Sequence, residues 1–465
     1  MAIAGLIVAL SSSFSLAATL EVGPGAPYAT IQAAIDAATP SVDNVLVHCG
    51  VYEENLVLKS GVSVSGAGAG CTVVDGAAAG SVVRAVDTNS STVFEGFTLR
   101  NGSAAQGGGV YIEAAALTLR HNIIEANSAI GATFPNGVGG GIHIQTDFNR
   151  AFTEPSIRGN VIRNNSAERF GGGISIDTDD GSTIADNIII GNSAGLLGGG
   201  INMFNSFPDL INNTIVRNCS QSGGPACTGG GGGVAVTDSG VVDFHNNLIA
   251  WNEAADGGGG IDSITSSFDF QSNDVFGNLP GNYSGLADPT GTAGNLSVDP
   301  LLIDEIPALS GHQPRSDSPL IDAGITGLVS ALDIRGVPRA LDGDADGVAT
   351  PDIGARENEG PTRLGFMSSN IVFWDPSVEP SAVWNLYRGE LPVLKATGVY
   401  TQDNVSAPDS RQWCGVNVSN VSDMDTPTAG QIWFYLAVVS AGVEGALGFD
   451  SSLTSRPFTD PNRCP

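Results

Sequence analysis

The sequence predicts an all-β protein: a right-handed parallel β-helix, which is a solenoid of stacked coils, followed by a small antiparallel β-sandwich. Three observations support this fold class. A glycine run recurs six times, a pair of asparagines recurs with it, and aliphatic residues stand at fixed offsets from both. The 465 residues leave room for a long solenoid and at least one further domain.

Glycine runs followed by a β-branched residue mark the coils. The last glycine of each run is Gly109, Gly141, Gly173, Gly200, Gly233 or Gly260, and the shortest spacing is 27 residues. Such runs are unfavourable in a helix but suit a tight bend where successive coils pass close together. Because a repeat of this length is one supersecondary unit, we expect a strand to begin just after each run.

Each coil also carries two asparagines five residues apart. The first members are Asn122, Asn160, Asn187, Asn213, Asn247 and Asn273, and the second are Asn127, Asn165, Asn192, Asn218, Asn252 and Asn278. Asparagine adopts the left-handed backbone region more readily than other non-glycine residues, so we expect these residues to form one corner in every coil and to stack in ladders. Leucine-rich repeats have a similar period but would show leucines at fixed offsets, which are absent.

Changes in composition along the chain suggest four segments. Residues 1–19 have the short apolar core of an export signal, although its basic n-region is missing. We assign residues 20–298 to the β-helix, 299–360 to a cap over its carboxyl end, and 361–465 to the sandwich. The sandwich is predicted from alternating patterns such as NIVFWDP, AVWNLYRGE and QIWFYLAVV.

The amino-terminal part predicts a short helix that covers the open end of the solenoid. Residues 28–38, YATIQAAIDAA, place Ile31, Ala34 and Ile35 on one face. The run from Tyr28 through VYEEN resembles the start of secreted right-handed parallel β-helix proteins of the pectin-lyase-like superfamily. The resemblance implies the fold and an extracellular setting. The catalytic motifs of pectin methylesterases, polygalacturonases and pectate lyases are absent, so it implies no catalytic site.

Two later segments resemble accessory parts of secreted bacterial proteins. DIRGVPR at 333–339 and DIGARE at 352–357 resemble a choice-of-anchor segment, which implies the cap. The order of Trp374, Tyr387 and Trp433 in the last hundred residues resembles a fibronectin type III-like module.

The six cysteines fall into three neighbouring pairs. The pairings we expect are Cys49 with Cys71, Cys219 with Cys227, and Cys414 with Cys464; the sequence leaves other connectivities open. No stretch after the start is long and apolar enough to cross a membrane. Together with the export signal, this predicts a secreted or cell-surface bacterial protein in an oxidising space.

The net charge of −29, with only two lysines, argues against a nucleic-acid partner, because phosphate binding needs a positive surface. An anionic polysaccharide is also repelled unless calcium or a group of arginines intervenes. Arg120 and Arg158 occupy equivalent positions in adjacent repeats. They are either solvated residues of the outer face or part of an anion-binding stripe.

An acidic segment near residue 342 is a candidate calcium loop. Asp342, Asp344 and Asp346 alternate and a glycine follows, as at the start of an EF-hand-type loop. The twelfth position is Ile353, and Asp352 stands one residue earlier. A structural calcium site and a plain acidic turn both remain open.

The residues just after each glycine run form the candidate binding face. Alternation places two outward columns on this face. The first contains Tyr111, His143, Ser175, Asn202, Ala235 and Asp262, and the next contains Glu113, Gln145, Asp177, Phe204 and Thr237. From this mixed polar face we expect a monomeric, non-catalytic protein that binds extracellular polysaccharide.

The alternative is a polysaccharide lyase that acts on the same face. His143 or Tyr111 would serve as the base and Arg150 would neutralise a substrate carboxylate. A glycosidase is disfavoured, because Glu113 and Asp177 are two coils apart. That is about 10 Å, which is beyond the usual separation of paired catalytic carboxylates.

Overall fold

The computed structural model describes residues 17–146, 154–178, 181–220, 230–303, 312–315, 317–327, 329–343, 348–358, 364–368, 371–374, 384–390, 410–416, 420–422 and 433–439. The chain divides into two compact units, residues 1–358 and 359–465, and each unit is described by itself. The predicted export signal lies almost wholly outside the described residues. No helix of the described segments has the length and apolar character to cross a membrane.

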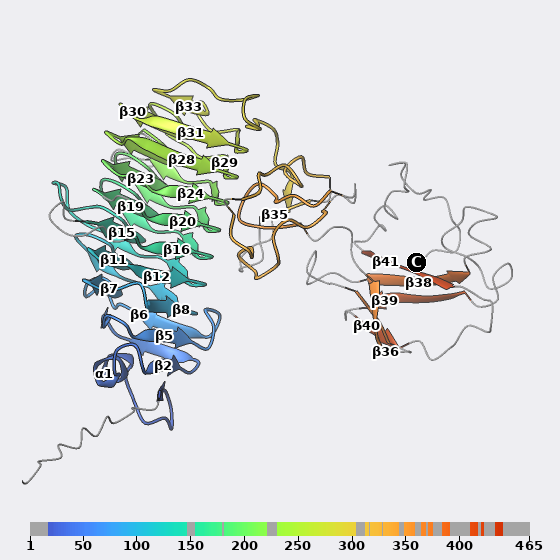
Figure 1. Cartoon of the computed structure of the whole chain (residues 1–465), viewed down its shortest axis with the longest axis horizontal. Coiled ribbons are helices and arrows are strands. Elements are labelled where there is room, and N and C mark those ends of the chain that lie inside the picture. Colours follow the sequence, from blue (N-terminus) through green and yellow to red (C-terminus); the bar gives the residue numbers. More distant parts are fainter. Residues whose placement is uncertain are drawn as a thin grey trace, which may run out of the picture. The chain divides into compact units, whose positions relative to one another are not determined.

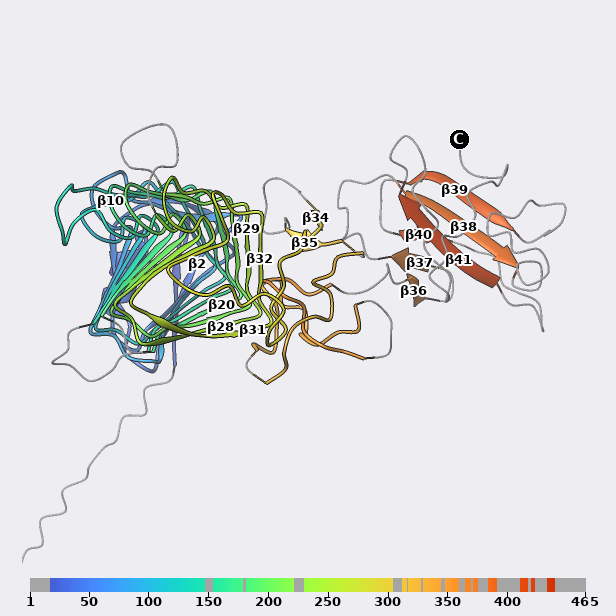
Figure 2. The same ribbon diagram turned by 90° about the horizontal axis from the view of Figure 1, so that it is seen from above.

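The first unit is a solenoid of parallel strands (Figures 1 and 2). One coil contains β11 (Val110–Glu113), β12 (Leu117–Arg120), β13 (Ile123–Glu125) and β14 (Ser128–Ala129). Each strand pairs in parallel with its counterpart in the next coil, so the coils build four sheets, which we call A to D. A strand begins directly after each of the six glycine runs, as the sequence predicts.

The four sheets extend the pattern of this coil along the solenoid. Sheet A contains β1 (Thr19–Val22), β2 (Asn44–Val47), β5 (Ser63–Gly66), β8 (Thr92–Glu95), β12, β16 (Ser156–Arg158), β20 (Thr183–Ala185), β24 (Asp209–Ile211), β28 (Val241–His245) and β31 (Ser267–Gln271). Sheet B contains β3 (Gly50–Glu53), β6 (Thr72–Asp75), β9 (Thr98–Arg100), β13, β17 (Val161–Arg163), β21 (Ile188–Ile190), β25 (Thr214–Val216), β29 (Leu248–Ala250) and β32 (Asp274–Phe276). Sheet C contains β4 (Leu56–Val57), β7 (Val83–Val86), β11, β15 (Ile142–Gln145), β19 (Ile174–Asp177), β23 (Ile201–Phe204), β27 (Val234–Thr237), β30 (Ile261–Ile264) and β33 (Tyr283–Ser284). Sheet D contains β10 (Ser103–Ala104), β14, β18 (Ser166–Ala167), β22 (Ser193–Ala194) and β26 (Cys219–Ser220).

The core is a column of aliphatic side chains that point inward from sheets A, B and C, among them Ile112, Leu119 and Ile124 of one coil. Helix α1 (Ile31–Ala37) covers the amino-terminal end, and Ile31, Ala34 and Ile35 are buried as predicted. Its first turn is held by the Glu54 carboxylate, which accepts hydrogen bonds from the backbone N–H groups of Ile31 (2.8 Å) and Gln32 (3.0 Å).

Both asparagine ladders exist, but the prediction that the asparagines adopt the left-handed conformation is wrong. The residue before each asparagine has positive φ instead, for example His121 (54°) before Asn122 and Asp186 (57°) before Asn187. The asparagines are buried, and each side-chain oxygen accepts hydrogen bonds from the preceding ladder member. The preceding residues therefore form the corner, and the asparagine side chains provide hydrogen-bond partners for its buried backbone groups.

Residues 283–298 cover the carboxyl end of the solenoid. Tyr283 and Leu286 pack against the last core residues together with Phe268 and Phe270 of β31. Asn295 extends the first asparagine ladder, since its oxygen accepts from the Asn273 backbone N–H at 3.0 Å. The ordered end of the solenoid thus lies before residue 299.

The described residues between 299 and 358 lie on the outer side of sheet B rather than across the carboxyl end, where the sequence predicts a cap (Figure 1). They include the short strands β34 (Leu302–Ile303) and β35 (Gln313–Pro314). Leu320 and Ile353 pack on Leu248, while Ile334 packs in the cluster that holds Ile188. The apolar outer positions of sheet B explain this placement, because they need a cover.

A buried ion cluster also fixes this segment to the solenoid. The Arg339 guanidinium lies 2.7 Å from Asp186 of the solenoid and 3.2 Å from Glu357 of its own segment. Only 1% of the Arg339 side chain is exposed. Burial raises the pKa of Asp186 even though Arg339 opposes this shift, so the carboxylate depends on its partner.

The structure contains the Cys49–Cys71 disulfide, as predicted. Cys219 and Cys414 are also disulfide-bonded. Their expected partners, Cys227 and Cys464, lie outside the described residues, so these two pairings stay predictions.

The second unit contains two antiparallel sheets. One comprises β36 (Leu364–Ser368), β37 (Ile371–Trp374) and β40 (Asn420–Ser422), and the other β38 (Trp384–Glu390), β39 (Arg411–Val416) and β41 (Trp433–Val439). Strands therefore form at all three alternating patterns noted in the sequence. The fibronectin type III-like sandwich itself stays a prediction.

Candidate functional site

The strands of sheet C position the two predicted columns. Tyr111 pairs with His143, which pairs with Ser175, which pairs with Asn202. Two residues further along each strand, Glu113 pairs with Gln145 and Gln145 pairs with Asp177. The predicted register is therefore correct, and each column crosses consecutive coils.

The first column does not face solvent, which corrects our prediction. Tyr111 is 5%, His143 and Ser175 are 0%, and Asn202 is 4% exposed. The cause is the first glycine of each run, which lies directly over this column. A Cβ on Gly139, for instance, would stand 2.7 Å from the His143 Cβ, and the φ of +67° at this glycine also disfavours any other residue.

The buried column and its exposed neighbours form one hydrogen-bonded network. The Tyr111 hydroxyl donates to Glu113 Oε2 (3.0 Å) and accepts from Gln145 Nε2 (3.0 Å). Gln145 Oε1 lies 3.1 Å from His143 Nε2. The guanidinium of Arg84 lies over the Tyr111 ring, 4.5 Å from its centroid. These contacts hold Glu113 and Gln145 in fixed positions at the strand ends.

Burial controls the protonation states in this network. It raises the pKa of Tyr111 to about 12, and the nearby Glu113 adds to the shift. It also lowers the pKa of His143, although Asp177 and Gln145 oppose this, so the imidazole is uncharged at neutral pH. His143 Nδ1 is buried and has no hydrogen-bond partner among the described residues. Neither group is accessible to a bound substrate.

The second column is the accessible one. Glu113, Gln145 and Asp177 are partly exposed, and Phe204, the next member, is exposed. Burial raises the pKa of the Asp177 carboxyl, while His143 lowers it. Its Oδ1 is 3.5 Å from the Ser175 hydroxyl, a long contact that leaves the carboxylate able to accept from a ligand. Carboxylate and amide oxygens on successive coils can bind hydroxyl groups.

Sequence reasoning missed two contributors to this face, Arg84 and Phe207. Arg84 comes from a coil without a glycine run, so nothing in the repeat pattern indicated that it pairs with Tyr111. Phe207 is an exposed aromatic residue near Phe204, which the predicted column already contains. The sequence does contain one sign of the Phe207 position, which is the glycine at residue 240. The Phe207 ring lies over Gly240 in the next coil, where a side chain would collide with the ring. The predicted neutraliser Arg150 lies outside the described residues.

The predicted calcium site stays a prediction. Asp344 and Asp346 lie outside the described residues. Asp352 is buried, and its oxygens accept from the backbone N–H groups of Asp322 (2.9 Å) and Asn358 (2.5 Å), so it serves the fold of this segment. Within the described residues, no group of three or more histidine, cysteine or acidic side chains is arranged to hold a metal ion.

The predicted stacking of arginines is confirmed, since Arg120 pairs with Arg158 across adjacent coils. The Arg120 side chain, however, forms an ion pair with Glu95 at 2.5 Å, and Arg158 Nε donates to Ser156 Oγ (2.8 Å). These contacts favour the interpretation as solvated residues of the outer face over an anion-binding stripe.

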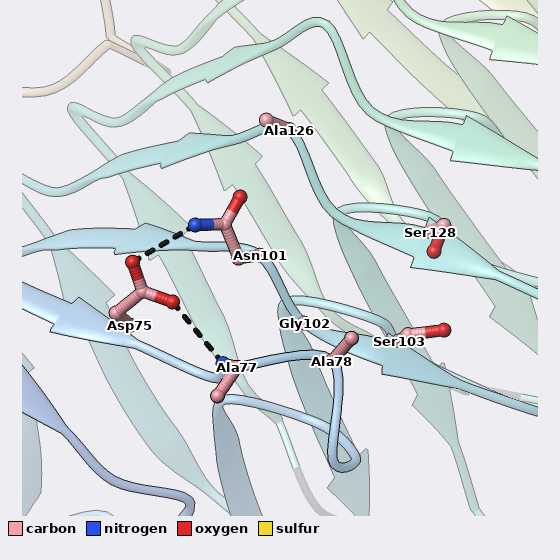
Figure 3. A pocket seen from close by; sticks show the side chains of 8 residues that line it. All are labelled: Asp75, Ala77, Ala78, Asn101, Gly102, Ser103, Ala126 and Ser128. Atoms are coloured by element: carbon pink, nitrogen blue, oxygen red, sulfur yellow. Dashed lines mark hydrogen bonds between the residues drawn. The ribbon is translucent and has the colours of Figure 1, made fainter.

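A shallow depression of about 440 Å³ lies at the corner between sheets B and D (Figure 3). Asp75, Asn101 and Ser103 contribute polar groups to it. The Asp75 carboxylate already accepts from Asn101 Nδ2 (2.8 Å), from the Ala77 N–H (3.1 Å) and from Arg100 Nε (2.9 Å). Because its acceptors are satisfied internally, this depression is a weaker candidate than the face of sheet C.

Among the comparisons with known proteins, the family-model match supports the fold. Residues 60–279 match the family model described as a right handed beta helix region. Among solved structures, the pectate lyase Pel9A is 16% identical, with 74% of this chain and 98% of that chain covered and a TM-score of 0.42. Pectin methylesterase PemA from Erwinia chrysanthemi is 13% identical, with 50% and 67% covered and a TM-score of 0.22. The A-module of the Azotobacter vinelandii mannuronan C-5 epimerase AlgE6 is 17% identical, with 58% and 94% covered and a TM-score of 0.23. No curated protein matches the chain. The family match and the stacked parallel sheets confirm the predicted right-handed parallel β-helix.

Proposed function

We propose that this protein is a secreted or cell-surface, non-catalytic protein that binds extracellular polysaccharide along the outer strand ends of sheet C. The observation that carries the proposal is the accessible column of Glu113, Gln145 and Asp177. These hydrogen-bonding side chains stand in register on three consecutive coils, beside the exposed ring of Phe204. A polymer lying along the solenoid axis would meet the same kind of group once in each coil.

The contacts within the site favour binding over catalysis. A lyase on this face needs an accessible base beside the proton that it removes. His143 is fully buried, and the Tyr111 hydroxyl is held between Glu113 and Gln145 with a pKa raised to about 12. The two candidate bases therefore stabilise the binding column rather than reach a substrate.

Co-sedimentation with insoluble polysaccharides tests the proposal. The double variant Gln145→Ala, Asp177→Asn should lose most of the binding. Its melting temperature should fall by a few degrees, because Gln145 is a hydrogen-bond partner of the buried Tyr111 and His143, and circular dichroism should show that the fold is retained. Glu53→Gln is the matched control, since Glu53 is an exposed acid on sheet B. Full binding by the double variant would place the binding site elsewhere.

A parallel assay separates binding from β-elimination. Incubation with pectate, alginate and glycosaminoglycans should give no rise in the ultraviolet absorbance of unsaturated products. A rise that the double variant abolishes would establish the lyase alternative instead.

A further inference from the structure

An exposed apolar patch adjoins the polar column. It consists of Phe204 (39% exposed), Phe207 (38%), Val241 (58%) and Ile264 (50%), and we call it the apolar patch. Exposed apolar side chains that gather in one place mark binding surfaces more often than single ones do.

The register places this patch on consecutive coils. Phe204 pairs with Asp177 on one side and with Thr237 on the other, and Thr237 pairs with Ile264. The Phe207 ring lies against Gly240 of the next coil, where a Cβ would stand 2.3 Å from Phe207 Cε1. Because Gly240 carries no side chain, one face of this ring packs on backbone and the ring is held in place. Phe204 and Ile264 thus continue the line of Glu113, Gln145 and Asp177 along the solenoid, and Phe207 and Val241 lie beside that line.

The charged side chains of the described strands nearest the patch are mostly acidic. From β11 to β30 the strands of sheet C contain Glu113, Asp177 and Asp262 but neither lysine nor arginine. The adjoining strands β24, β28 and β31 of sheet A add a row of three in-register aspartates, Asp209, Asp243 and Asp269, and contain neither lysine nor arginine. Their one histidine, His245 of β28, is buried and lies 3.7 Å from Asp269. A polyanion that approaches this surface is repelled, and no described cation on these strands offsets the repulsion.

We infer that the polysaccharide bound on sheet C is uncharged, with the C–H faces of its sugar rings on Phe204 and Phe207 and its hydroxyl groups donating to Asp177. This inference rests on the proposed function and specifies its ligand class. A hydroxyl donates to a carboxylate without bringing a like charge to the site, and aromatic rings offer apolar area that a sugar face can cover. A uronate-containing chain fits the rings but not the carboxylates.

Calorimetric titration with hexasaccharides of equal length tests the inference. Cellohexaose and mannohexaose represent uncharged chains, and hexagalacturonate and hexamannuronate represent charged ones, each measured with and without calcium. We expect an uncharged hexasaccharide to bind in both conditions, with an affinity that changes little with salt because no ion pair forms. Phe204→Ala should weaken this binding about tenfold, and Phe207→Ala should also weaken it.

Val51→Ala is the control variant, because Val51 is 64% exposed on sheet B. It should bind as the unaltered protein does. The melting temperature and circular dichroism of each variant confirm that the fold is retained.

The outcomes distinguish this inference from the proposed function. If only the uronates bind, or bind only with calcium, the uncharged ligand class is wrong while polysaccharide binding stands. If no oligosaccharide or polysaccharide binds, the proposed function fails. If light scattering shows dimers that Phe204→Ala dissociates, the apolar patch is a self-association surface and the inference is overturned.

Discussion

The buried asparagine is the residue on which the solenoid depends. Asn187 accepts from the Asn160 backbone N–H (3.0 Å) and from its side-chain N–H₂ (3.1 Å), and it donates to Ile157 O (2.8 Å) and Asn213 Oδ1 (3.1 Å). All four groups belong to a corner from which water is excluded. The Asn187 side chain stabilises the solenoid because it pairs buried donors and acceptors that would otherwise lack partners.

Asn187→Ala should therefore destabilise the solenoid strongly. The variant leaves several buried donors and acceptors without partners, each costing about 1–3 kcal/mol, so the free energy of unfolding should fall by several kcal/mol. Denaturant unfolding measures this. Asn44→Ala is the control, since Asn44 is exposed on β2, and it should change the free energy of unfolding by less than about 0.5 kcal/mol. Equal losses in the two variants would contradict the role of the ladder.

At the scale of residues, the sequence predicted which asparagines stack but not how. Periodicity identifies Asn122 and Asn187 as equivalent, and the ladders follow from that. It does not reveal that His121 and Asp186 take the left-handed conformation, because the hydrogen bonds of the asparagines offset the strain at these neighbours. The same limit applies to His143: alternation places it opposite the core, but only the path of Gly139 shows that it is covered.

At the scale of elements, the carboxyl end of the solenoid contains a buried acid. Asp274 of β32 stands in register with Leu248, Thr214 and Ile188, so it occupies a mostly apolar column of sheet B. Its Oδ1 accepts from the Val298 N–H (2.9 Å), while Oδ2 is buried without a hydrogen-bond partner among the described residues. Burial raises the pKa of Asp274 to about 7, and Asp299 adds to the shift.

This pKa makes the carboxyl end sensitive to pH. Because the folded pKa lies above the unfolded value of 3.8, the contribution of Asp274 to stability is fully present below about pH 4 and is lost as the pH rises to about 7. Asp274→Asn removes this dependence. Thermal unfolding across that range should show the stability advantage of the variant over the unaltered protein growing with pH. A constant difference would show that Asp274 is ionised throughout.

The segment that covers sheet B depends on Arg339. Arg339→Ala should cost about 3–5 kcal/mol, because it leaves Asp186 and Glu357 buried without their cation. Hydrogen exchange should then increase in residues 320–358 before it increases in the solenoid. Arg315→Ala removes an exposed ion pair with Asp317 and should cost less than about 1 kcal/mol. Unchanged exchange in Arg339→Ala would mean that the apolar contacts alone hold the segment.

Elements with a strong local sequence pattern could be predicted. The position of a segment that is set by contacts with residues distant in sequence could not. Helix α1 was predicted with its buried face, because Ile31, Ala34 and Ile35 follow a helical period. The strands after the glycine runs were also predicted. The position of residues 299–358 was not, because their short strands have no periodicity and their partners on sheet B are distant in sequence.

At the scale of the whole molecule, the repeat determines both the fold and the candidate site. Identical coils stack equivalent residues, so any polar strand end becomes a column, as with Glu113, Gln145 and Asp177. The acidic composition of the chain appears on this face as carboxylates, which the guanidinium of Arg84 approaches only at the Tyr111 end. Sequence alone could identify the face, but it could not choose between the buried and the accessible column or reveal the adjoining apolar patch.

Hydroxyl-radical footprinting with a saturating polysaccharide ligand tests the central claim most directly, because it reports where the ligand lies. The account predicts that labelling of Phe204 and Phe207 falls in the bound state. Labelling of Trp251, which follows β29 at the corner between sheets B and D, should stay unchanged. Protection of Trp251 with unaltered labelling of Phe204 would contradict binding on sheet C.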